Sequence, residues 1–445
     1  MTPRFGTDGI RGPVGTVVTI EIVRALGAAA VRGLGADAPF LIARDTRASG
    51  PELEAALVEG ITRAGGDAHV LGVLPTPGLA SACAETGAAG AMISASHNPF
   101  GDNGVKLFER GGRKLRDETE AAVETALHAI LDDGAPIDGA EGAGRVTEVT
   151  DGIDGYVARL VAAAGGGTPF AALRVVLDCA HGAAADAAPA AFRALGATVT
   201  VIGAEPDGRN INAGVGSTHP DLVASEVVAH GADAGLAFDG DADRVVAVDA
   251  HGTVVDGDHI LAILALDLDA RGALRHRAIA TTVMANLGLI RALEPHGIDV
   301  IVTPVGDRHV LAAMEDHDLV LGGEQSGHVI AAAHAVTGDG PLTGVLLLDA
   351  MVRSGRPLHE LAAVVTKYPQ VLESVRVARR EDLDGATEFW GAVEAAEAEL
   401  AGEGRVLVRP SGTEPVVRVM VEAPDAATAR RITDALTVAL HDALG

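Results

Sequence analysis

Aromatic side chains are scarce in this sequence, with one Trp, two Tyr and eight Phe among 445 residues. Hydrophobic residues nevertheless make up 48% of the chain, and Ala, Val and Leu supply most of them. The cores should therefore be aliphatic layers, which are typical of helices packed on sheets. The chain is too long for one core, so we expect about three or four domains of ordinary size.

Cysteine and long apolar runs are also scarce. Cys83 and Cys179, the two cysteines, lie far apart in apolar surroundings, which favours buried thiols in a reducing compartment over a disulfide framework. No uninterrupted apolar run reaches the roughly 18 residues of a membrane-spanning helix. The start "MTPRFGTDGIRG" lacks the tripartite pattern of a signal peptide. We expect a soluble, cytoplasmic protein with no membrane partner.

Basic residues are scarce relative to acidic ones. Lys and Arg number 34 against 61 Asp and Glu, which gives a formal net charge of -27. No basic run offsets this excess, so most of the surface should repel a polyanion. We therefore expect no nucleic-acid partner.

Short runs rich in Val, Ile and Leu alternate with Ala-rich stretches of helical spacing. Residues 39–46, 67–77 and 87–96 predict strands, with helices at 50–65 and 79–86. Residues 173–203 predict a strand, a helix and a second strand. The absence of a short fixed period argues against a solenoid, and the alternation predicts an α/β fold.

Three stretches are typical of linkers or boundaries. They are the Gly- and acid-rich residues 131–148, residues 249–258 and residues 365–374. They divide the chain into four domains at 1–148, 149–252, 253–367 and 368–445. The expected fold is three similar mixed α/β domains followed by a smaller C-terminal α+β domain.

The segment "LAFDGDADRVVAVD" places Asp239, Asp241 and Asp243 in a turn between two apolar runs. Three carboxylates beside a core repel one another unless a counter-ion holds them, and a hard divalent cation prefers such oxygen ligands. An EF-hand loop would need Gly and Glu where the chain has Arg244 and Ala250. The alternative is a solvated acidic turn.

The segment "RPSGTEPVVRVMVE" combines features that favour binding of a phosphate group. Gly412 allows backbone N–H groups to approach an anion, and Ser411 and Thr413 add hydroxyl donors. Arg409 and Arg418 can each bind phosphate oxygens with two N–H groups. The alternative is a plain turn before a strand.

The segment "MISASHNPFGDNGVKLF" brings Ser96 and His97 to the end of a predicted strand, with Lys106 after a turn. Loops at strand ends are where open α/β sheets bind ligands. Serine needs a base or metal to become a nucleophile, and the absence of G-x-S-x-G argues against a serine hydrolase. A hydrogen-bonded bystander histidine and a solvated lysine are the alternatives.

The segment "GGEQSGH" alternates Glu324, Ser326 and His328. In an extended loop these three side chains would share one face and offer an acceptor, a hydroxyl and an imidazole. That combination suits a polyhydroxylated ligand, and an ordinary polar loop is the alternative.

The segments "SASHNP", "DGDADR", "GEQSGH" and "RPSGTEP" occur in the order and spacing of one family. With them, the chain resembles the α-D-phosphohexomutase superfamily from Phe5 to about Glu422. The stretches "FGTDGIRG", "ARDTRASG", "DGRNINAGVGSTHP" and "VTGDG" make it most similar to the bacterial phosphoglucosamine mutase family. This resemblance implies four domains that enclose one active-site cleft.

The resemblance also implies roles for individual residues. Ser96 would carry the transferable phosphoryl group and bind one Mg²⁺ together with Asp239, Asp241 and Asp243. Glu324 and Ser326 would contact sugar hydroxyls. A further set would hold the non-reacting phosphate: Arg409, Ser411, Gly412, Thr413 and Arg418. Another would line the cleft in acid–base or electrostatic roles: Arg11, His97, Lys106, Arg244 and His328.

The implied reaction interconverts glucosamine 6-phosphate and glucosamine 1-phosphate through a bisphosphorylated sugar. Gln325 is the form that the resemblance associates with glucosamine phosphates, and residues 367–370 would let the C-terminal domain rotate as a lid. A phosphoglucomutase or phosphomannomutase, a metal-dependent sugar phosphatase and a non-catalytic sugar-phosphate-binding protein are the alternatives. The expected partner is a small sugar phosphate, and a homodimer is left open.

Overall fold

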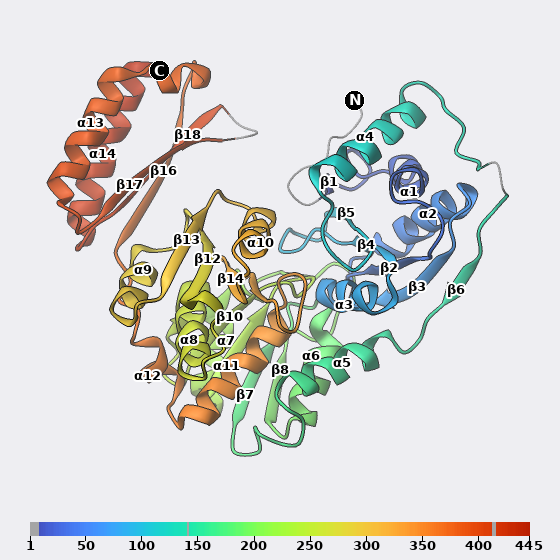
Figure 1. Ribbon diagram of the computed structural model, residues 1–445, viewed down its shortest axis with the longest axis horizontal. Coiled ribbons are helices and arrows are strands. Elements are labelled where there is room, and N and C mark those ends of the chain that lie inside the picture. Colours follow the sequence, from blue (N-terminus) through green and yellow to red (C-terminus); the bar gives the residue numbers. More distant parts are fainter. Residues whose placement is uncertain (1–8, 140–141, 412–414) are drawn as a thin grey trace.

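The computed structural model describes residues 9–139, 142–411 and 415–445. Their strands form four separate sheets of six, five, four and three strands. We call the parts built on these sheets domains I to IV, in chain order (Figure 1). The predicted architecture, three α/β/α domains and a C-terminal domain, is confirmed.

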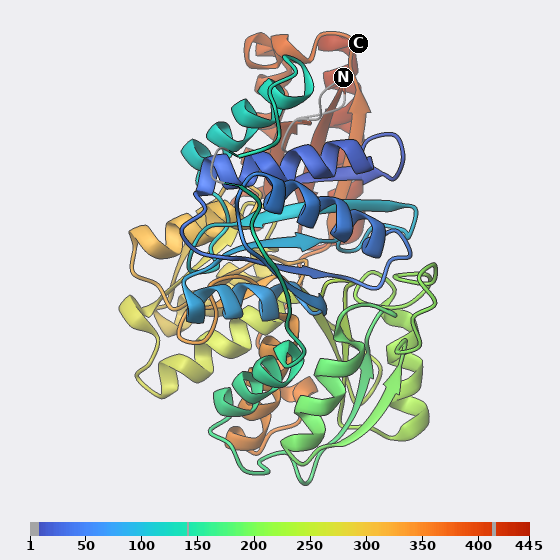
Figure 2. The ribbon, with the colours of Figure 1, turned by 90° about the vertical axis from the view of Figure 1, so that its right-hand side faces the viewer.

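Domain I carries a mixed sheet of order β1-β5-β4-β2-β3-β6, in which β2 pairs in parallel with β3 and β4. Helices α1, α2 and α4 cover one face and α3 the other (Figure 2). Its elements are β1 (Ile10–Pro13), α1 (Ile20–Leu34), β2 (Phe40–Arg44), α2 (Gly50–Arg63), β3 (Ala68–Val73), α3 (Thr76–Thr86), β4 (Ala89–Ile93), β5 (Asp102–Phe108), α4 (Asp117–Leu131) and β6 (Val146–Glu148).

The strands and helices predicted between residues 39 and 96 are confirmed. The stretch predicted as a linker, residues 131–148, ends instead in the short edge strand β6, which adds to β3 in parallel. All three β6 residues are exposed. A three-residue strand with no buried face has no hydrophobic alternation, so its sequence gives no strand signal.

Domain II has the strand order β11-β10-β9-β7-β8. The strand, helix and strand predicted at residues 173–203 are confirmed as β7, α6 and β8. The elements are α5 (Gly152–Ala163), β7 (Arg174–Asp178), α6 (Ala184–Ala194), β8 (Thr198–Ile202), α7 (Pro220–His230), β9 (Ala234–Phe238), β10 (Val245–Asp249) and β11 (Val254–Val255).

Domain III has the strand order β13-β12-β14-β15. Its last long helix, α11, packs against α8 and also against α5 and β10 of domain II, so domains II and III share one hydrophobic core. The elements are α8 (Gly257–Ala270), β12 (Ala278–Thr282), α9 (Leu287–Leu293), β13 (Asp299–Thr303), α10 (Asp307–Asp316), β14 (Leu321–Gly323), β15 (Val329–Ala331), α11 (Gly340–Ser354) and α12 (Leu358–Ala362).

Domain IV is a three-stranded antiparallel sheet of order β16-β18-β17 with two helices on one face. It follows a single connecting segment and stands away from domain I (Figure 1), and it contacts domain III, where Asn286 Nδ2 donates to Glu422 Oε1 at 3.0 Å. The elements are β16 (Gln370–Arg376), α13 (Thr387–Leu400), β17 (Arg405–Pro410), β18 (Val416–Glu422) and α14 (Ala426–Leu444).

Both cysteines are buried and free, as predicted. Burial raises the pKa of the Cys83 thiol to about 12, which keeps it protonated and unreactive. Within the described residues, no helix has both the length and the apolarity that crossing a bilayer requires.

Candidate active site

Ser96 lies in the loop after β4, at the carboxyl end of that strand, and its side chain is buried. Its φ of 53° is in the left-handed region that non-glycine residues rarely adopt. The Ser96 hydroxyl donates to Asp239 Oδ2 at 2.6 Å, and its backbone N–H donates to Ser94 Oγ at 2.9 Å. The loop after β4, which carries Ser96 and which we call the serine loop, therefore contacts the loop after β9, which carries Asp239 and which we call the metal loop.

Arg47, which is fully buried, holds this loop in place. Its Nε donates to Asp45 Oδ2 at 2.9 Å. Its two terminal nitrogens donate to four backbone carbonyls of the loop, those of Ser96 (2.9 Å), Asn98 (2.8 Å), Pro99 and Asp102 (3.0 Å). No sequence pattern indicates this role of Arg47, because its acceptors are backbone carbonyls.

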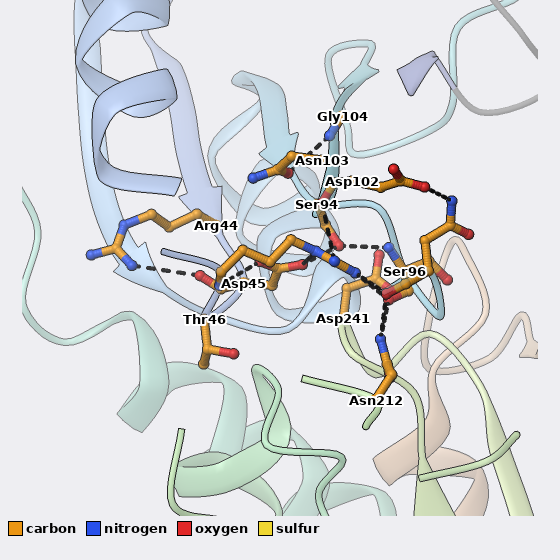
Figure 3. A network of polar contacts seen from close by, with 12 residues as sticks. Arg44, Asp45, Thr46, Ser94, Ser96, Asp102, Asn103, Gly104, Asn212 and Asp241 are labelled. Atoms are coloured by element: carbon orange, nitrogen blue, oxygen red, sulfur yellow. Dashed lines mark hydrogen bonds and ion pairs between the residues drawn. The ribbon is translucent and has the colours of Figure 1, made fainter. Parts of the chain in front are cut away.

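Asn212 supports the same loop from domain II. Its Nδ2 donates to the Ser96 carbonyl at 2.8 Å and to the Asn98 carbonyl at 3.1 Å (Figure 3). The Ser96 carbonyl thus accepts hydrogen bonds from Arg47 of domain I and Asn212 of domain II. This residue was also missed, although its segment "DGRNINAGVG" contributed to the family resemblance.

The three predicted metal ligands meet between β9 and β10. One ligand atom from each of Asp239, Asp241 and Asp243 lies within 4.8 Å of the others, and all three side chains are buried. Burial and repulsion by the other two carboxylates raise the pKa of Asp239 well above its ordinary value. Although burial acts in the same sense on Asp243, Lys106 and His328 hold its pKa well below the ordinary range.

The aspartate cluster fits a divalent cation. Asp241 Oδ1 and Asp243 Oδ1 are buried, and neither has a hydrogen-bond partner among the described residues. A buried carboxylate oxygen without a partner is costly. A hard cation would satisfy both oxygens, because carboxylates are the ligands that Mg²⁺ and Ca²⁺ prefer.

Lys106, on β5, contacts the aspartate cluster from domain I. Its Nζ lies 2.7 Å from Asp241 Oδ2 and 3.2 Å from Asp243 Oδ2. Thr76, at the start of α3, donates its hydroxyl to the same Asp241 oxygen at 2.7 Å, a contact that no sequence motif marks. Lys106 is therefore a buried ion-pair partner rather than a solvated lysine.

His97 and Arg244 complete the surroundings of Ser96. His97 Nδ1 lies 3.3 Å from Ser96 Oγ. Burial, together with Arg244 and Arg11, lowers the pKa of His97 to about 4, so the imidazole is neutral near pH 7. The Arg244 backbone N–H donates to Asp239 Oδ1 at 3.2 Å. Arg11 lies on β1, which pairs with β5, the strand that follows the Ser96 loop.

The "GGEQSGH" loop joins β14 and β15. Ser326 Oγ lies 3.4 Å from Glu324 Oε2, so these two predicted sugar ligands are side by side. His328 is instead fully buried, with Nε2 accepting from Gly338 N at 3.2 Å and Nδ1 lying 3.7 Å from Asp243 Oδ2. The shared face expected for all three side chains therefore holds for Glu324 and Ser326, while His328 supports the metal loop.

In domain IV, Arg409 on β17 and Arg418 on β18 are direct cross-strand partners. Burial and the neighbouring positive charge of Arg418 lower the pKa of Arg409. Two adjacent cations repel unless an anion lies between them, which fits a phosphate site. Ser411 is buried beside them, whereas Gly412 and Thr413 lie outside the described residues.

Four family models match the chain in succession. They are phosphoglucomutase/phosphomannomutase α/β/α domain I at residues 2–133, domain II at 154–252, domain III at 256–368 and the C-terminal domain at 372–438. Each match contains one of the predicted site segments, which are, in order, those of Ser96, Asp239, Glu324 and Arg409.

Full-length relatives agree with the domain matches. The chain is 48% identical to a phosphoglucosamine mutase of Parafrankia sp., with 100% of both chains covered. A phosphoglucomutase/phosphomannomutase family protein from Burkholderia thailandensis has a similar crystal structure, with a TM-score of 0.81 and 25% identity over 100% of this chain and 98% of that one.

A more distant structure is that of Aspergillus fumigatus N-acetylphosphoglucosamine mutase in complex with GlcNAc-6P and magnesium. It has a TM-score of 0.72 and 18% identity, covering 100% of this chain and 96% of that one. At this identity the likeness shows the fold alone.

Proposed function

Because the chain belongs to the α-D-phosphohexomutase superfamily and to its phosphoglucosamine mutase family, we propose that it interconverts glucosamine 6-phosphate and glucosamine 1-phosphate. The observation that carries the proposal is the Ser96 hydroxyl 2.6 Å from Asp239, inside a cluster of three buried aspartates. The product would supply amino sugar for cell-wall precursors in the cytoplasm.

The reaction needs a relay because O1 and O6 of a hexosamine lie too far apart for direct transfer. In the forward direction, the bond between phosphorus and Ser96 Oγ breaks while phosphorus bonds to the sugar O1. The O1 hydroxyl loses its proton and Ser96 Oγ gains one, giving the bisphosphorylated sugar and a free serine hydroxyl. After the sugar turns, the phosphate on O6 passes to Ser96 and leaves glucosamine 1-phosphate. Phosphate is conserved over the cycle, and Ser96 ends phosphorylated as it began.

The residues around Ser96 suit this chemistry. Asp239, Asp241, Asp243 and phosphorylated Ser96 would hold Mg²⁺, which supplies neutralisation of charge on the transferring group. Lys106 and Arg244 add positive charge at the same point. Both predicted proton carriers are buried. Lys106 is favoured because its Nζ lies 2.7 Å from Asp241 Oδ2, whereas His328 Nδ1 lies 3.7 Å from Asp243 Oδ2.

Domain IV would bind the phosphate that does not react, through Arg409, Ser411, Gly412, Thr413 and Arg418. Because each phosphate of the bisphosphate must occupy this site in turn, the site should recognise charge rather than one sugar orientation. We propose that residues 367–370 let domain IV rotate as a lid, closing on phosphate and opening while the sugar turns.

One assay separates this function from its alternatives. Glucosamine, glucose and mannose 6-phosphates are compared at equal Mg²⁺ and equal amounts of bisphosphorylated primer, and free phosphate is measured in parallel. The proposal predicts the highest specificity constant for glucosamine 6-phosphate and no release of phosphate. Preference for glucose or mannose would indicate the rival mutases, stoichiometric phosphate a phosphatase, and binding without turnover a non-catalytic protein.

A further inference from the structure

We call residues 322–328, which span the end of β14 and the loop to β15, the sugar loop. Gln325, its middle residue, contacts another part of domain III. Its Nε2 donates to Asp258 Oδ2 at 2.7 Å. Asp258 is buried in the first turn of α8. The backbone N–H of Gly257 also donates to the Gln325 carbonyl, at 3.1 Å. The start of α8 therefore holds the sugar loop through both a side chain and the backbone.

The same Asp258 oxygen accepts a second hydrogen bond, from the Asn286 backbone N–H at 2.8 Å. Asn286 is fully buried and caps α9. Its side-chain Oδ1 accepts from Tyr368 N at 2.9 Å, and its Nδ2 donates to Tyr368 O at 3.0 Å. Asp258 and Asn286 thus connect the sugar loop to the backbone between domains III and IV.

Asn286 also binds domain IV itself. Its Nδ2 donates to Glu422 Oε1 at 3.0 Å, and Leu287 N donates to the other oxygen of Glu422 at 3.0 Å. Glu422, the last residue of β18, is fully buried and also accepts from Arg405 Nε at 2.6 Å. We call Gln325, Asp258, Asn286, Tyr368 and Glu422 the loop-to-hinge network.

Backbone packing makes this network stiff at both ends. A Cβ at Gly257 would lie 2.1 Å from the Glu324 carbonyl oxygen, and a Cβ at Gly288 would lie 2.3 Å from the Thr366 carbonyl oxygen. Only glycine permits such close approach of two backbones. A shift of the sugar loop therefore pushes on α8, and a shift of the hinge pushes on α9.

We propose that Asp258 and Asn286 are positioning residues that couple occupation of the sugar loop to the domain III–IV hinge. A sugar seated against Glu324 and Ser326 would fix Gln325, and the network would then restrict the motion of Tyr368 and Glu422 at the hinge. Gln325 acts through Asp258, so its influence on the reaction is exerted at the hinge. This inference rests on the proposed function, since it assigns the signal for closure to the sugar rather than to phosphate alone.

The hydrogen bonds of Asp258 allow it to link the sugar loop to Asn286. One of its oxygens accepts both hydrogen bonds of the network, while the other, Oδ1, is buried without a hydrogen-bond partner in the part of the chain that the structure describes. Asparagine could therefore replace it and keep both hydrogen bonds. Alanine could not.

The test measures hydrogen exchange of the hinge amides, those of Lys367, Tyr368 and Gln370, in the full chain with glucosamine 6-phosphate or with inorganic phosphate. Inorganic phosphate can fill the domain IV site without touching the sugar loop, so the difference isolates the sugar's effect. In the wild type we expect exchange to be about tenfold slower with the sugar phosphate, the scale of one hydrogen bond. Gln325→Met, which lacks the amide donor, and Asp258→Ala should lose this difference.

Two variants serve as controls. Asp258→Asn should keep the difference, because it keeps the shared acceptor. Arg291→Ala should also keep it, because it removes a separate contact between domains III and IV, the 2.7 Å hydrogen bond from Arg291 Nη2 to Gly402 O. A sugar-dependent difference that survives in Gln325→Met, or that disappears equally in Arg291→Ala, would overturn the proposal. Gln325 is only partly buried, so its variant decides the matter even if Asp258→Ala does not fold.

A kinetic readout accompanies the exchange measurement. An uncoupled hinge should release the bisphosphorylated sugar before it turns, so Gln325→Met should lower kcat and release about tenfold more bisphosphate per turnover, with KM little changed. Unchanged bisphosphate release would also count against the coupling. A wild type that does not isomerise glucosamine 6-phosphate would refute the proposed function, whereas an active wild type with unaltered hinge behaviour in Gln325→Met refutes only the coupling.

Discussion

The Arg47 guanidinium donates to the Ser96 carbonyl across 2.9 Å in a contact shielded from solvent. The Ser96 backbone has a positive φ, which costs on the order of 1 kcal/mol or more and persists only where the surroundings impose it. Arg47 imposes it by binding four carbonyls of the loop at once. Asp45 orients the guanidinium in turn, so a buried ion pair positions the residue that we propose to carry phosphate.

Replacing Arg47 by lysine should therefore impair both stability and catalysis. An ammonium group has three donors on one atom and cannot reproduce the planar fork. We expect Arg47→Lys to lose about 2 to 4 kcal/mol in free energy of unfolding and at least about tenfold in kcat. Denaturant unfolding and mutase kinetics would check this. Arg44→Lys, at a partly exposed ion pair with Glu54, is the control, and equal losses in both variants would contradict the positioning role.

The serine itself provides the most direct test of the relay. Ser96→Ala removes the phosphoryl acceptor, so it should lose most mutase activity while still binding glucosamine 6-phosphate. Intact-mass analysis of the wild type should show a phosphorylated fraction that Ser96→Ala lacks and that Ser326→Ala keeps. Full activity in Ser96→Ala would refute the assignment.

The sequence predicted the positions of Ser96 and Asp239 well, because each follows an apolar strand and carries an uncommon set of polar side chains. It did not predict the roles of Arg47 and Asn212, since both act on backbone carbonyls that every residue possesses. Likewise the contact between Gln325 and Asp258 joins residues 67 positions apart, and no local pattern marks it.

The elements of the fold likewise divide into those that the sequence predicts and those that it does not. Strands β2, β3 and β4 have apolar runs that predict them, whereas β6 is short and exposed, so its sequence predicts a linker. Helix α11 is buried on nearly every side. A helix without one apolar face cannot indicate by its pattern which sheet it covers, so the core shared by domains II and III was not foreseen.

Removing one charge from the aspartate cluster should change the metal dependence. Asp241 Oδ2 accepts from Lys106 and Thr76 while Oδ1 has no partner among the described residues. We expect Asp241→Asn to lower activity and to recover part of it at higher Mg²⁺, because an oxygen ligand remains but the charge does not. Asp249 is the last residue of β10, and its Oδ1 accepts from the backbone N–H groups of the following turn. Asp249→Asn should leave the Mg²⁺ dependence unchanged. The same Mg²⁺ dependence in Asp241→Asn and wild type would place the cation elsewhere.

A pH dependence of stability should come from Asp339, which caps α11. Burial raises the pKa of Asp339 to about 7, although hydrogen bonds from Leu342 N and the Tyr156 hydroxyl oppose this. The folded state therefore holds a proton that the unfolded state has released, and stability falls as pH rises from about 4 to about 7.

Asp339→Asn cannot ionise and isolates this effect. The stability of the wild type minus that of the variant should fall by about 1.4 kcal/mol per pH unit inside the window and level off above it. Denaturant unfolding at several pH values would measure the slope. Tyr156→Phe removes a donor that favours the ionised form, so its decline should extend to higher pH. A difference that does not vary with pH would show that Asp339 is ionised throughout.

The preference for an amino sugar should depend on Glu324. The 2-amino group of glucosamine 6-phosphate is a cation near neutral pH, and a carboxylate next to Ser326 offers it a charge-assisted hydrogen bond. A hexose with a hydroxyl at that carbon would lose about 1 to 3 kcal/mol, or roughly one to two decades in rate. Glu324→Gln should therefore reduce the ratio of specificity constants for glucosamine and glucose 6-phosphates toward one. Ser326→Ala removes a hydroxyl that does not distinguish the two sugars, so it should lower both constants alike. If Glu324→Gln also lowered both alike, the amino group would be recognised by another residue.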